Sequence, residues 1–343
     1  MTLIAASRST RYSVRPRAGL VWLAPLAALC VCLPLATWAV AIALFGLPHV
    51  LMEMRYVAHR FGVRLRSLAW LLGPPLLLAI AARAATALQL ISPERSGAVE
   101  LVSGASLALV AVCAMKRRRA TGALLAAAIV AGAYVSAPAT LLILALLHNF
   151  TPVALLADAA PTGRKAATAF RAAAIFLLPP LVLLTGLPFA LLDTAGWTAP
   201  HWSPLPAGQL DTAIAAYVPP IFAQRSWALD AFSAAVMAQC LHYYATIRVL
   251  PAMTPPHPRD RFAVIAFAFT SAILTGAFVM DYATAKTVYG IAALAHAWIE
   301  IPVLLLALDA AYDANTSPAA KEAPFADRDS ASARAAEAGN AIT

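Results

Sequence analysis

Long apolar stretches recur along the chain, and short polar or basic segments separate them. Clear examples are residues 71–80, 175–192 and 262–280. A helix of about 20 mostly apolar residues is long enough to cross a lipid bilayer. The pattern therefore predicts an all-α protein, a polytopic transmembrane helix bundle of about ten spans, or of eight if the weakest segments do not cross. The expected spans are 18–33, 35–57, 67–90, 98–115, 120–134, 137–157, 170–193, 226–250, 262–280 and 287–309.

Basic residues indicate how the chain is threaded through the membrane. Four arginines precede residue 18, and four more lie within residues 55–66. If the stretch 18–57 crossed once, these two clusters would lie on opposite faces, whereas two crossings place both in the cytoplasm, as the positive-inside rule favours. The later inner loops are basic as well, at residues 116–119, 164–165 and 259–261. We therefore expect both termini in the cytoplasm and a multi-pass protein of the cell's inner (plasma) membrane.

The remaining segments complete the expected organisation. Residues 1–17 form a basic cytoplasmic segment, and the transmembrane domain covers residues 18–311. Within it, residues 194–225 are rich in proline and tryptophan and are expected to form an outer loop, in which residues 210–222 lie along the membrane surface. Residues 312–343 contain few large apolar side chains and are expected to be a disordered cytoplasmic tail.

Composition agrees with a membrane protein and excludes an ordinary soluble domain. The chain is 62% hydrophobic and 12% charged, whereas soluble domains are about 45–50% apolar and about 25% charged. The formal charge of +9 is explained by the cytoplasmic loops. No basic stretch is interleaved with aromatic residues, so nucleic acid is not an expected partner. Membrane lipids are expected partners. The four cysteines lie in apolar segments without a CxxC pair and are expected to be free thiols.

Four of the seven histidines lie inside predicted spans: His49, His148, His242 and His296. Their helices all run from outside to inside in the expected topology. Each histidine precedes the inner end of its helix by about 8–13 residues, which places all four roughly 12–20 Å from the cytoplasmic boundary. Four rings at a similar depth on four helices can meet at one point. The alternative is that each histidine only bonds to a neighbouring helix.

Two of these histidines are followed four residues later by a glutamate, Glu53 and Glu300, on the same helix face. Imidazole is a common ligand of iron, copper and zinc, and a nearby carboxylate binds the metal or orients the ring. A carboxylate in lipid is costly unless it is paired or coordinated. We therefore expect the four histidines to be metal ligands and the two glutamates to be ligands or ring-orienting groups. Tyr244, two residues after His242, is a further candidate.

The residues around the first histidine resemble a known family. Gly46-Leu47-Pro48-His49, followed by the acid at position 53, is similar to the GLPHxxxD segment of the Brp/Blh-type β-carotene-cleaving dioxygenases. By this resemblance His148 stands for the histidine of the family's HFG segment. His242 stands for the first histidine of its HxxxH segment, and His296 with its trailing glutamate stands for the final PH segment. The resemblance implies a membrane-embedded non-haem Fe(II) centre that activates O2 and cleaves a carotenoid to retinal.

The sequence departs from the family pattern at three places. Thr246 occupies the position of the second HxxxH histidine, Asn149-Phe150 replaces Phe-Gly, and position 53 carries Glu instead of Asp. His296 or a glutamate would then complete the ligand set.

Three functions remain open at this stage. The first is an oxidoreductase of dioxygenase type, which uses iron, or alternatively copper, and O2 to oxidise a lipophilic small molecule. The second is a haem-binding electron carrier, because paired histidines can ligate haem. The third is a proton-coupled transporter or another non-catalytic membrane protein, because intramembrane histidines and carboxylates can relay protons.

Overall fold

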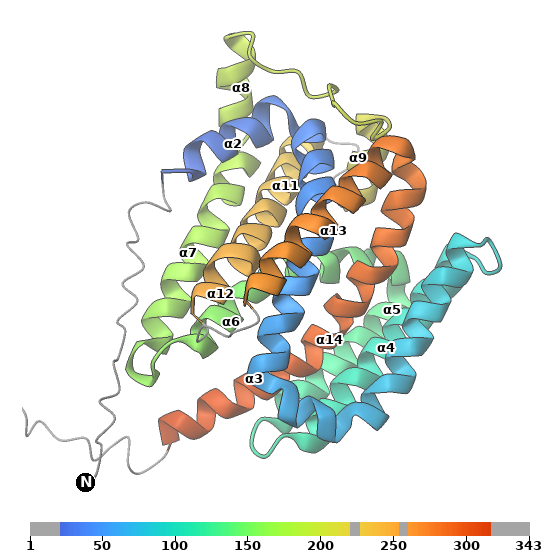
Figure 1. The fold of residues 1–343 in the computed structure, drawn as a ribbon, viewed down its shortest axis with the longest axis vertical. Helices are drawn as coiled ribbons and strands as arrows, with labels where there is room; N and C mark the ends of the chain where they lie inside the picture. Colours follow the sequence, from blue (N-terminus) through green and yellow to red (C-terminus); the bar gives the residue numbers. More distant parts are fainter. Residues whose placement is uncertain (1–20, 220–226, 254–259, 317–343) are drawn as a thin grey trace, which may run out of the picture.

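The computed structural model describes residues 21–219, 227–253 and 260–316, and every regular element in these ranges is helical (Figure 1). The α-helices are α2 (Leu23–Cys32), α3 (Pro34–Ala87), α4 (Pro93–Ala114), α5 (Arg119–His148), α6 (Thr151–Ala159), α7 (Lys165–Leu184), α8 (Leu187–Thr194), α9 (Leu210–Tyr217), α11 (Ala228–Tyr244), α12 (Leu250–Ala252), α13 (Asp260–Met280) and α14 (Tyr282–Thr316). Over these ranges the expected all-α fold is confirmed. Among the described residues, five helical segments are long and apolar enough to cross a membrane.

The ends of the chain are only partly described. The expected N-terminal segment 1–17 lies outside the described residues, as does the tail from residue 317 onward. Residues 312–316, expected to belong to the tail, are the last residues of α14. In the expected outer loop, the segment 210–222 contains α9, Leu210–Tyr217, which packs inward through Leu210, Ala213 and Ile214, and residues 220–222 lie outside the described residues.

Helix α3 joins two of the expected spans, because residues 58–66 continue the helix instead of forming a loop. This connection contains no proline, and Gly62 is its only weak helix former. The path of α3 bends at the lower edge of the molecule in Figure 1. Its first part packs in a core around Trp38, and its last part packs against α4 through Leu72 and Ala79. The described residues therefore show the expected helical bundle, and the number of ten spans stays a prediction.

Helix α5 does the opposite, because the chain reverses within it. Ser136 has an extended backbone, with φ −166° and ψ 99°. A Cβ added to Gly132 would lie 2.6 Å from the side chain of Thr140, although residues eight positions apart on a straight helix are separated by about 12 Å. Hence α5 consists of two antiparallel limbs, 119–135 and 137–148. They correspond to the fifth and sixth expected spans.

Two other expected spans are each divided into two helices. The span 170–193 is divided into α7 and α8 at Gly186, whose φ of 72° is in the left-handed region that favours glycine. The span 137–157 is divided after His148, and α6 begins at Thr151 with Pro152 in its first turn. Proline lacks the N–H that a continuous helix would use here.

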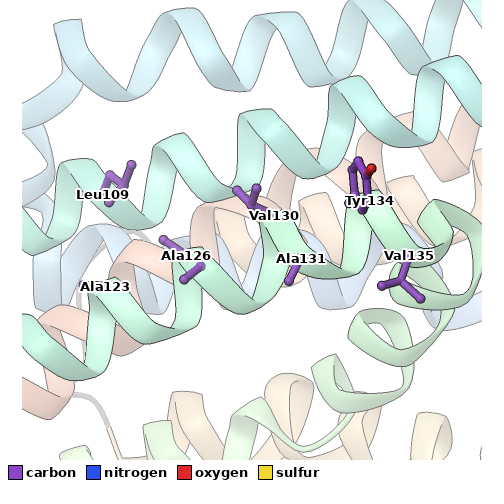
Figure 2. A pocket seen from close by; sticks show the side chains of 8 residues that line it. Leu109, Ala123, Ala126, Val130, Ala131, Tyr134 and Val135 are labelled. Atoms are coloured by element: carbon purple, nitrogen blue, oxygen red, sulfur yellow. The ribbon is translucent and has the colours of Figure 1, made fainter.

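In the part of the chain that the structure describes, three buried cores hold the bundle together, and α3 contributes to all of them. Helix α14 crosses behind α3 in Figure 1. It also contributes buried side chains to each of these cores. Between α4 and α5, Figure 2 shows a shallow groove lined by apolar side chains, among them Leu109, Ala126 and Tyr134. Such an outward-facing apolar lining suits contact with lipid.

Buried carboxylates away from the histidines are well supplied with donors. Asp309 accepts hydrogen bonds from the backbone N–H groups of Lys116, Arg117 and Arg118 at 3.0, 3.0 and 3.2 Å, which ties α14 to the loop between α4 and α5. Glu100 is 2.7 Å from Arg83 and also accepts from a serine hydroxyl. The carboxylates beside the histidines differ from these, as described next.

Candidate metal centre

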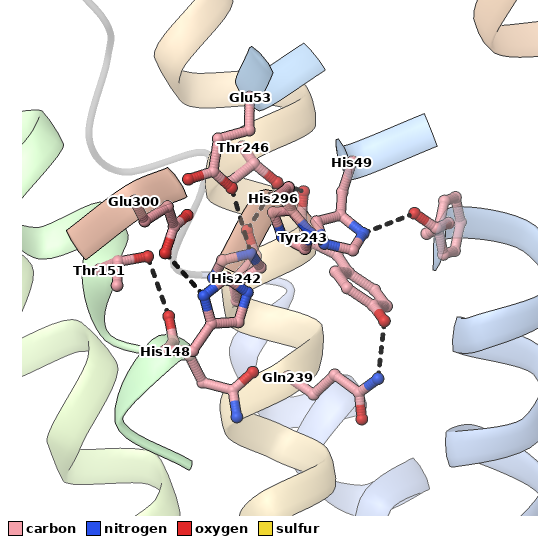
Figure 3. Close-up of polar contacts among 12 residues, drawn as sticks. His49, Glu53, His148, Thr151, Gln239, His242, Tyr243, Thr246, His296 and Glu300 are labelled. Atoms are coloured by element: carbon pink, nitrogen blue, oxygen red, sulfur yellow. Dashed lines mark hydrogen bonds and ion pairs between the residues drawn. The ribbon is translucent and has the colours of Figure 1, made fainter. Parts of the chain in front are cut away.

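The four histidines expected inside membrane spans meet at one point (Figure 3). His49 comes from α3, His148 from the end of α5, His242 from α11 and His296 from α14. One ring nitrogen from each lies within 4.8 Å of those of the other three. His49, His242 and His296 are at most 3% exposed. The structure therefore brings together the four histidines that the sequence analysis selected.

Hydrogen bonds fix the orientation of two rings. Nδ1 of His49 lies 3.1 Å from the carbonyl oxygen of Phe45, one turn earlier on α3. Nδ1 of His148 lies 2.7 Å from Oε2 of Glu300. A nitrogen that faces a carbonyl or a carboxylate carries the proton, so each ring keeps a bare Nε2. Nε2 of His49 is also 3.3 Å from Nε2 of His296, so these nitrogens face a common point.

The helix break after His148 shapes this side of the site. Because α5 stops there, the carbonyl groups of His148 and Asn149 are released from the helix and lie beside the His242 ring. The hydroxyl of Thr151 donates to the carbonyl oxygen of His148 at 2.9 Å and stabilises the turn. Interrupted helices inside a membrane occur where the irregular backbone is buried in protein or lines a functional cavity.

On the opposite side, α11 ends in a π-helical turn, Ala245–Val249. Fully buried Thr246 lies in this turn, and its hydroxyl donates to the carbonyl oxygens of His242 and Tyr243 at 3.0 and 3.2 Å. Its side chain is thus used within its own helix. Position 246, which the resemblance would assign to a second histidine, therefore supplies no ring here. The fourth ring of the cluster is that of His296, on α14. Single π turns are frequent at functional sites.

Two glutamates complete the cluster. Glu53 is 0% exposed and Glu300 is 1% exposed, and with His296 they form a second group whose ligand atoms lie within 4.8 Å of one another. Oε2 of Glu53 is 3.5 Å from Nε2 of His242. Within the described residues, the ion-pair contacts of these two glutamates are with His242 and His148 alone.

Several of these atoms lack a hydrogen-bond partner among the described residues. They are both oxygens of Glu53, Oε1 of Glu300, both nitrogens of His242 and Nδ1 of His296. A buried polar group without a partner costs about 1–3 kcal/mol, and more if it is charged. The unsatisfied groups are almost all acceptors or potential lone-pair donors. A metal cation would satisfy such a set.

The geometry and charge fit one divalent metal ion. Ligand nitrogens about 2.1 Å from a tetrahedral ion are about 3.4 Å apart, and the two Nε2 atoms of His49 and His296 are separated by 3.3 Å. Four neutral imidazoles, two carboxylates and one divalent cation sum to zero charge, which suits a buried site. A haem fits less well, because four imidazoles within 4.8 Å of one another leave no room for the porphyrin plane.

A tyrosine also touches the centre, and it is Tyr243 instead of the expected Tyr244. The Tyr243 ring stacks on His49, with centroids 4.3 Å apart and planes at 29°. Its hydroxyl accepts from Nε2 of Gln239 at 2.7 Å and lies 3.1 Å from the hydroxyl of Tyr289. Tyr244 is 47% exposed. Consecutive helical residues point about 100° apart, so the neighbouring position faces away from the site.

Sequence reasoning missed Tyr243, Gln239 and Tyr289, although helical spacing contained a signal. Gln239 precedes His242 by three residues, and Tyr289 precedes His296 by seven, so each shares a face with its histidine. Tyr289 also fills the space beside Gly46, where a Cβ would lie 2.9 Å from its ring. This close approach is a reason for glycine in the Gly-Leu-Pro-His segment.

Comparison of the chain with protein-family models, curated proteins and solved structures found no match to any of them. The inference of function therefore depends on the site itself.

Proposed function

We propose that the chain is a membrane-embedded, metal-dependent oxygenase that acts on a lipophilic substrate. The observation that carries the proposal is the convergence of four histidines and two glutamates, with several unsatisfied ligand atoms, in a bundle of apolar helices. His49, His148, His242 and His296 would hold the ion. Fe(II) is the proposed metal and copper the alternative, since imidazole suits both.

A bound ferrous ion would supply the electrons that O2 needs in order to react. The remaining roles belong to the chain. Glu300 holds the His148 ring through its Nδ1–H, and the Phe45 carbonyl does the same for His49. Glu53, beside His242, would compensate part of the positive charge of the bound ion. The apolar helices admit a lipophilic molecule from the bilayer and exclude bulk water.

Carotenoid cleavage to retinal is the first reaction to test, because of the resemblance around His49. Cleavage of one carbon–carbon double bond by one O2 gives two carbonyl groups, each with one oxygen atom, so no additional reductant is required. The membrane proposed for this reaction is the cell's inner membrane. The finer topology, with ten passes and both termini in the cytoplasm, is proposed on the distribution of basic residues.

Metal analysis of the purified protein tests the proposal. We expect about one iron or copper ion per chain after supplementation, and loss of the metal in His49→Ala. In cells that make β-carotene, the wild type should deplete the carotenoid and accumulate an aldehyde product, whereas the variant should not. Proton-coupled uptake in proteoliposomes that survives metal removal would contradict the proposal and favour a transporter.

A further inference from the structure

A second polar cluster lies at the start of α14, around its first residue Tyr282 and Lys286 one turn later, remote from the histidines. Lys286 places its Nζ 4.7 Å from the ring centroid of Trp38 and 6.0 Å from that of Tyr217. Trp38 belongs to α3 and Tyr217 to α9. Lys286 precedes His296 by ten residues, so the two lie about 15 Å apart along the helix.

The cluster contains hydrogen-bond donors without acceptors. The hydroxyl of Tyr282, a residue 5% exposed, has no hydrogen-bond partner among the described residues. Nε1 of Trp38, a residue 1% exposed, lies near the hydroxyl of Tyr217 but makes no hydrogen bond of good geometry with any described residue. Lys286, half-buried, makes no ion pair or hydrogen bond within the part of the chain that the structure describes. Its contacts with the two rings offset only part of the cost of removing an ammonium group from water.

The surroundings of these donors are aromatic. Trp38 packs against Tyr217 and Phe232, with ring centroids 5.4 and 6.2 Å away, and against Tyr282 at 6.0 Å. Lys286 supplies a cation here, and Trp38 and Tyr282 supply two neutral donors in an apolar setting. The histidine cluster has the opposite character, because it presents acceptors and lone pairs. The missing partner at this second cluster is an oxygen acceptor that carries negative charge.

The position along α14 indicates what kind of molecule carries that oxygen. Lys286 lies near the end of the membrane-spanning segment Tyr282–Asp309, where lipid headgroups and the polar ends of amphiphiles reside. The neighbouring aromatic core and the apolar helices suit a hydrocarbon chain.

We propose that Lys286, Trp38 and Tyr282 form a binding site for the anionic oxygen end of an acyl-chain amphiphile, a carboxylate or a phosphate. Identification of this amphiphile as the substrate rests on the proposed function, whereas binding itself does not.

The probe for this site is cis-parinaric acid, a fluorescent polyene fatty acid, with the protein in phosphatidylcholine nanodiscs. We expect saturable binding that Lys286→Met weakens at least about tenfold, because a hydrogen bond to a charged group is removed, and that Lys286→Arg preserves within about threefold. Tyr282→Phe should weaken binding by a smaller factor. The methyl ester of the probe, which lacks the charge, should bind to wild type and Lys286→Met equally.

Controls separate this proposal from the metal site and from loss of folding. Lys116→Met removes one exposed positive charge at the opposite end of α14 and should not change probe binding. His49→Ala should lose metal and retain the probe, whereas Lys286→Met should retain metal. If phosphatidylglycerol nanodiscs suppress binding of the probe to wild type, the site takes a lipid phosphate; if they do not, it takes a free carboxylate. Equal affinity of wild type and Lys286→Met for the acid would overturn the proposal.

Discussion

Replacing Glu300 by glutamine should change metal affinity and the stability of the metal-free protein in opposite directions. The substitution keeps the volume of the side chain but removes the negative charge and one acceptor. Glu300 is 1% exposed, its Oε2 is 2.7 Å from Nδ1 of His148, and its Oε1 has no partner among the described residues. The carboxylate thus orients one ligand ring but remains incompletely compensated when no metal is bound.

The two effects have different magnitudes. Loss of the carboxylate behind a ligand histidine reduces metal affinity about 10–100-fold, which corresponds to about 1.4–2.7 kcal/mol. In the metal-free protein, replacement of an incompletely paired buried charge by a neutral group of similar shape should raise the free energy of unfolding by about 1 kcal/mol. A larger loss of affinity would indicate that Glu300 binds the metal directly.

Glu100→Gln is a matched control for this experiment. Glu100 is also 1% exposed, but Arg83 and Ser96 satisfy both of its oxygens, at 2.7 and 3.0 Å. Because Arg83 is partly exposed, Glu100→Gln should lower the free energy of unfolding by only about 1–2 kcal/mol. It should not change metal affinity. Metal affinity is measured by competition with a chelator and elemental analysis, and stability by thermal unfolding after chelation. Metal binding by Glu300→Gln equal to that of wild type, or equal losses in both variants, would refute the reasoning.

Other substitutions test the packing and the edge of the site. Tyr243→Ala should weaken metal binding about threefold or more because the ring that stacks on a ligand histidine is lost, whereas Tyr244→Ala should not. Gly104→Ala should lower the free energy of unfolding by about 1–3 kcal/mol, because its Cβ would lie 2.0 Å from a tryptophan ring; Gly73→Ala, with open space around it, should be neutral or stabilising in thermal unfolding. Asp309→Ala should cost about 2–4 kcal/mol, since three backbone N–H groups lose their acceptor, and Asp309→Asn should restore part of that loss in the same assay.

The apolar pattern predicted the helical content well, because a membrane helix must contain a long run of apolar residues. It separated the two limbs of α5, because the expected spans 120–134 and 137–157 part at Ser136, but it did not predict that two spans join into α3. Residues 58–66 are polar enough to resemble a loop, yet nothing in them stops a helix. Whether such a segment continues a helix is decided by tertiary packing, which hydropathy does not report.

The site was more predictable than the path of the chain. Polar residues are rare in lipid-facing sequence, so His49, His148, His242 and His296 were conspicuous, and their similar estimated depth agreed with their meeting. The tyrosine was assigned to the neighbouring residue, because a shift of one position rotates a side chain by about 100° and the phase of α11 is set by packing.

The reversal inside α5 also has a consequence for the lipid around the protein. Its first limb, 119–135, is about 25 Å long, whereas the adjacent α4 is about 33 Å long and a typical hydrocarbon core is about 30 Å thick. A short hydrophobic segment beside a full-length one produces hydrophobic mismatch, which the bilayer relieves by thinning locally. The lipids along α5 should therefore be compressed relative to those along α4. Thermal stability of the protein in nanodiscs should accordingly depend on acyl-chain length, with shorter chains favouring this side of the bundle.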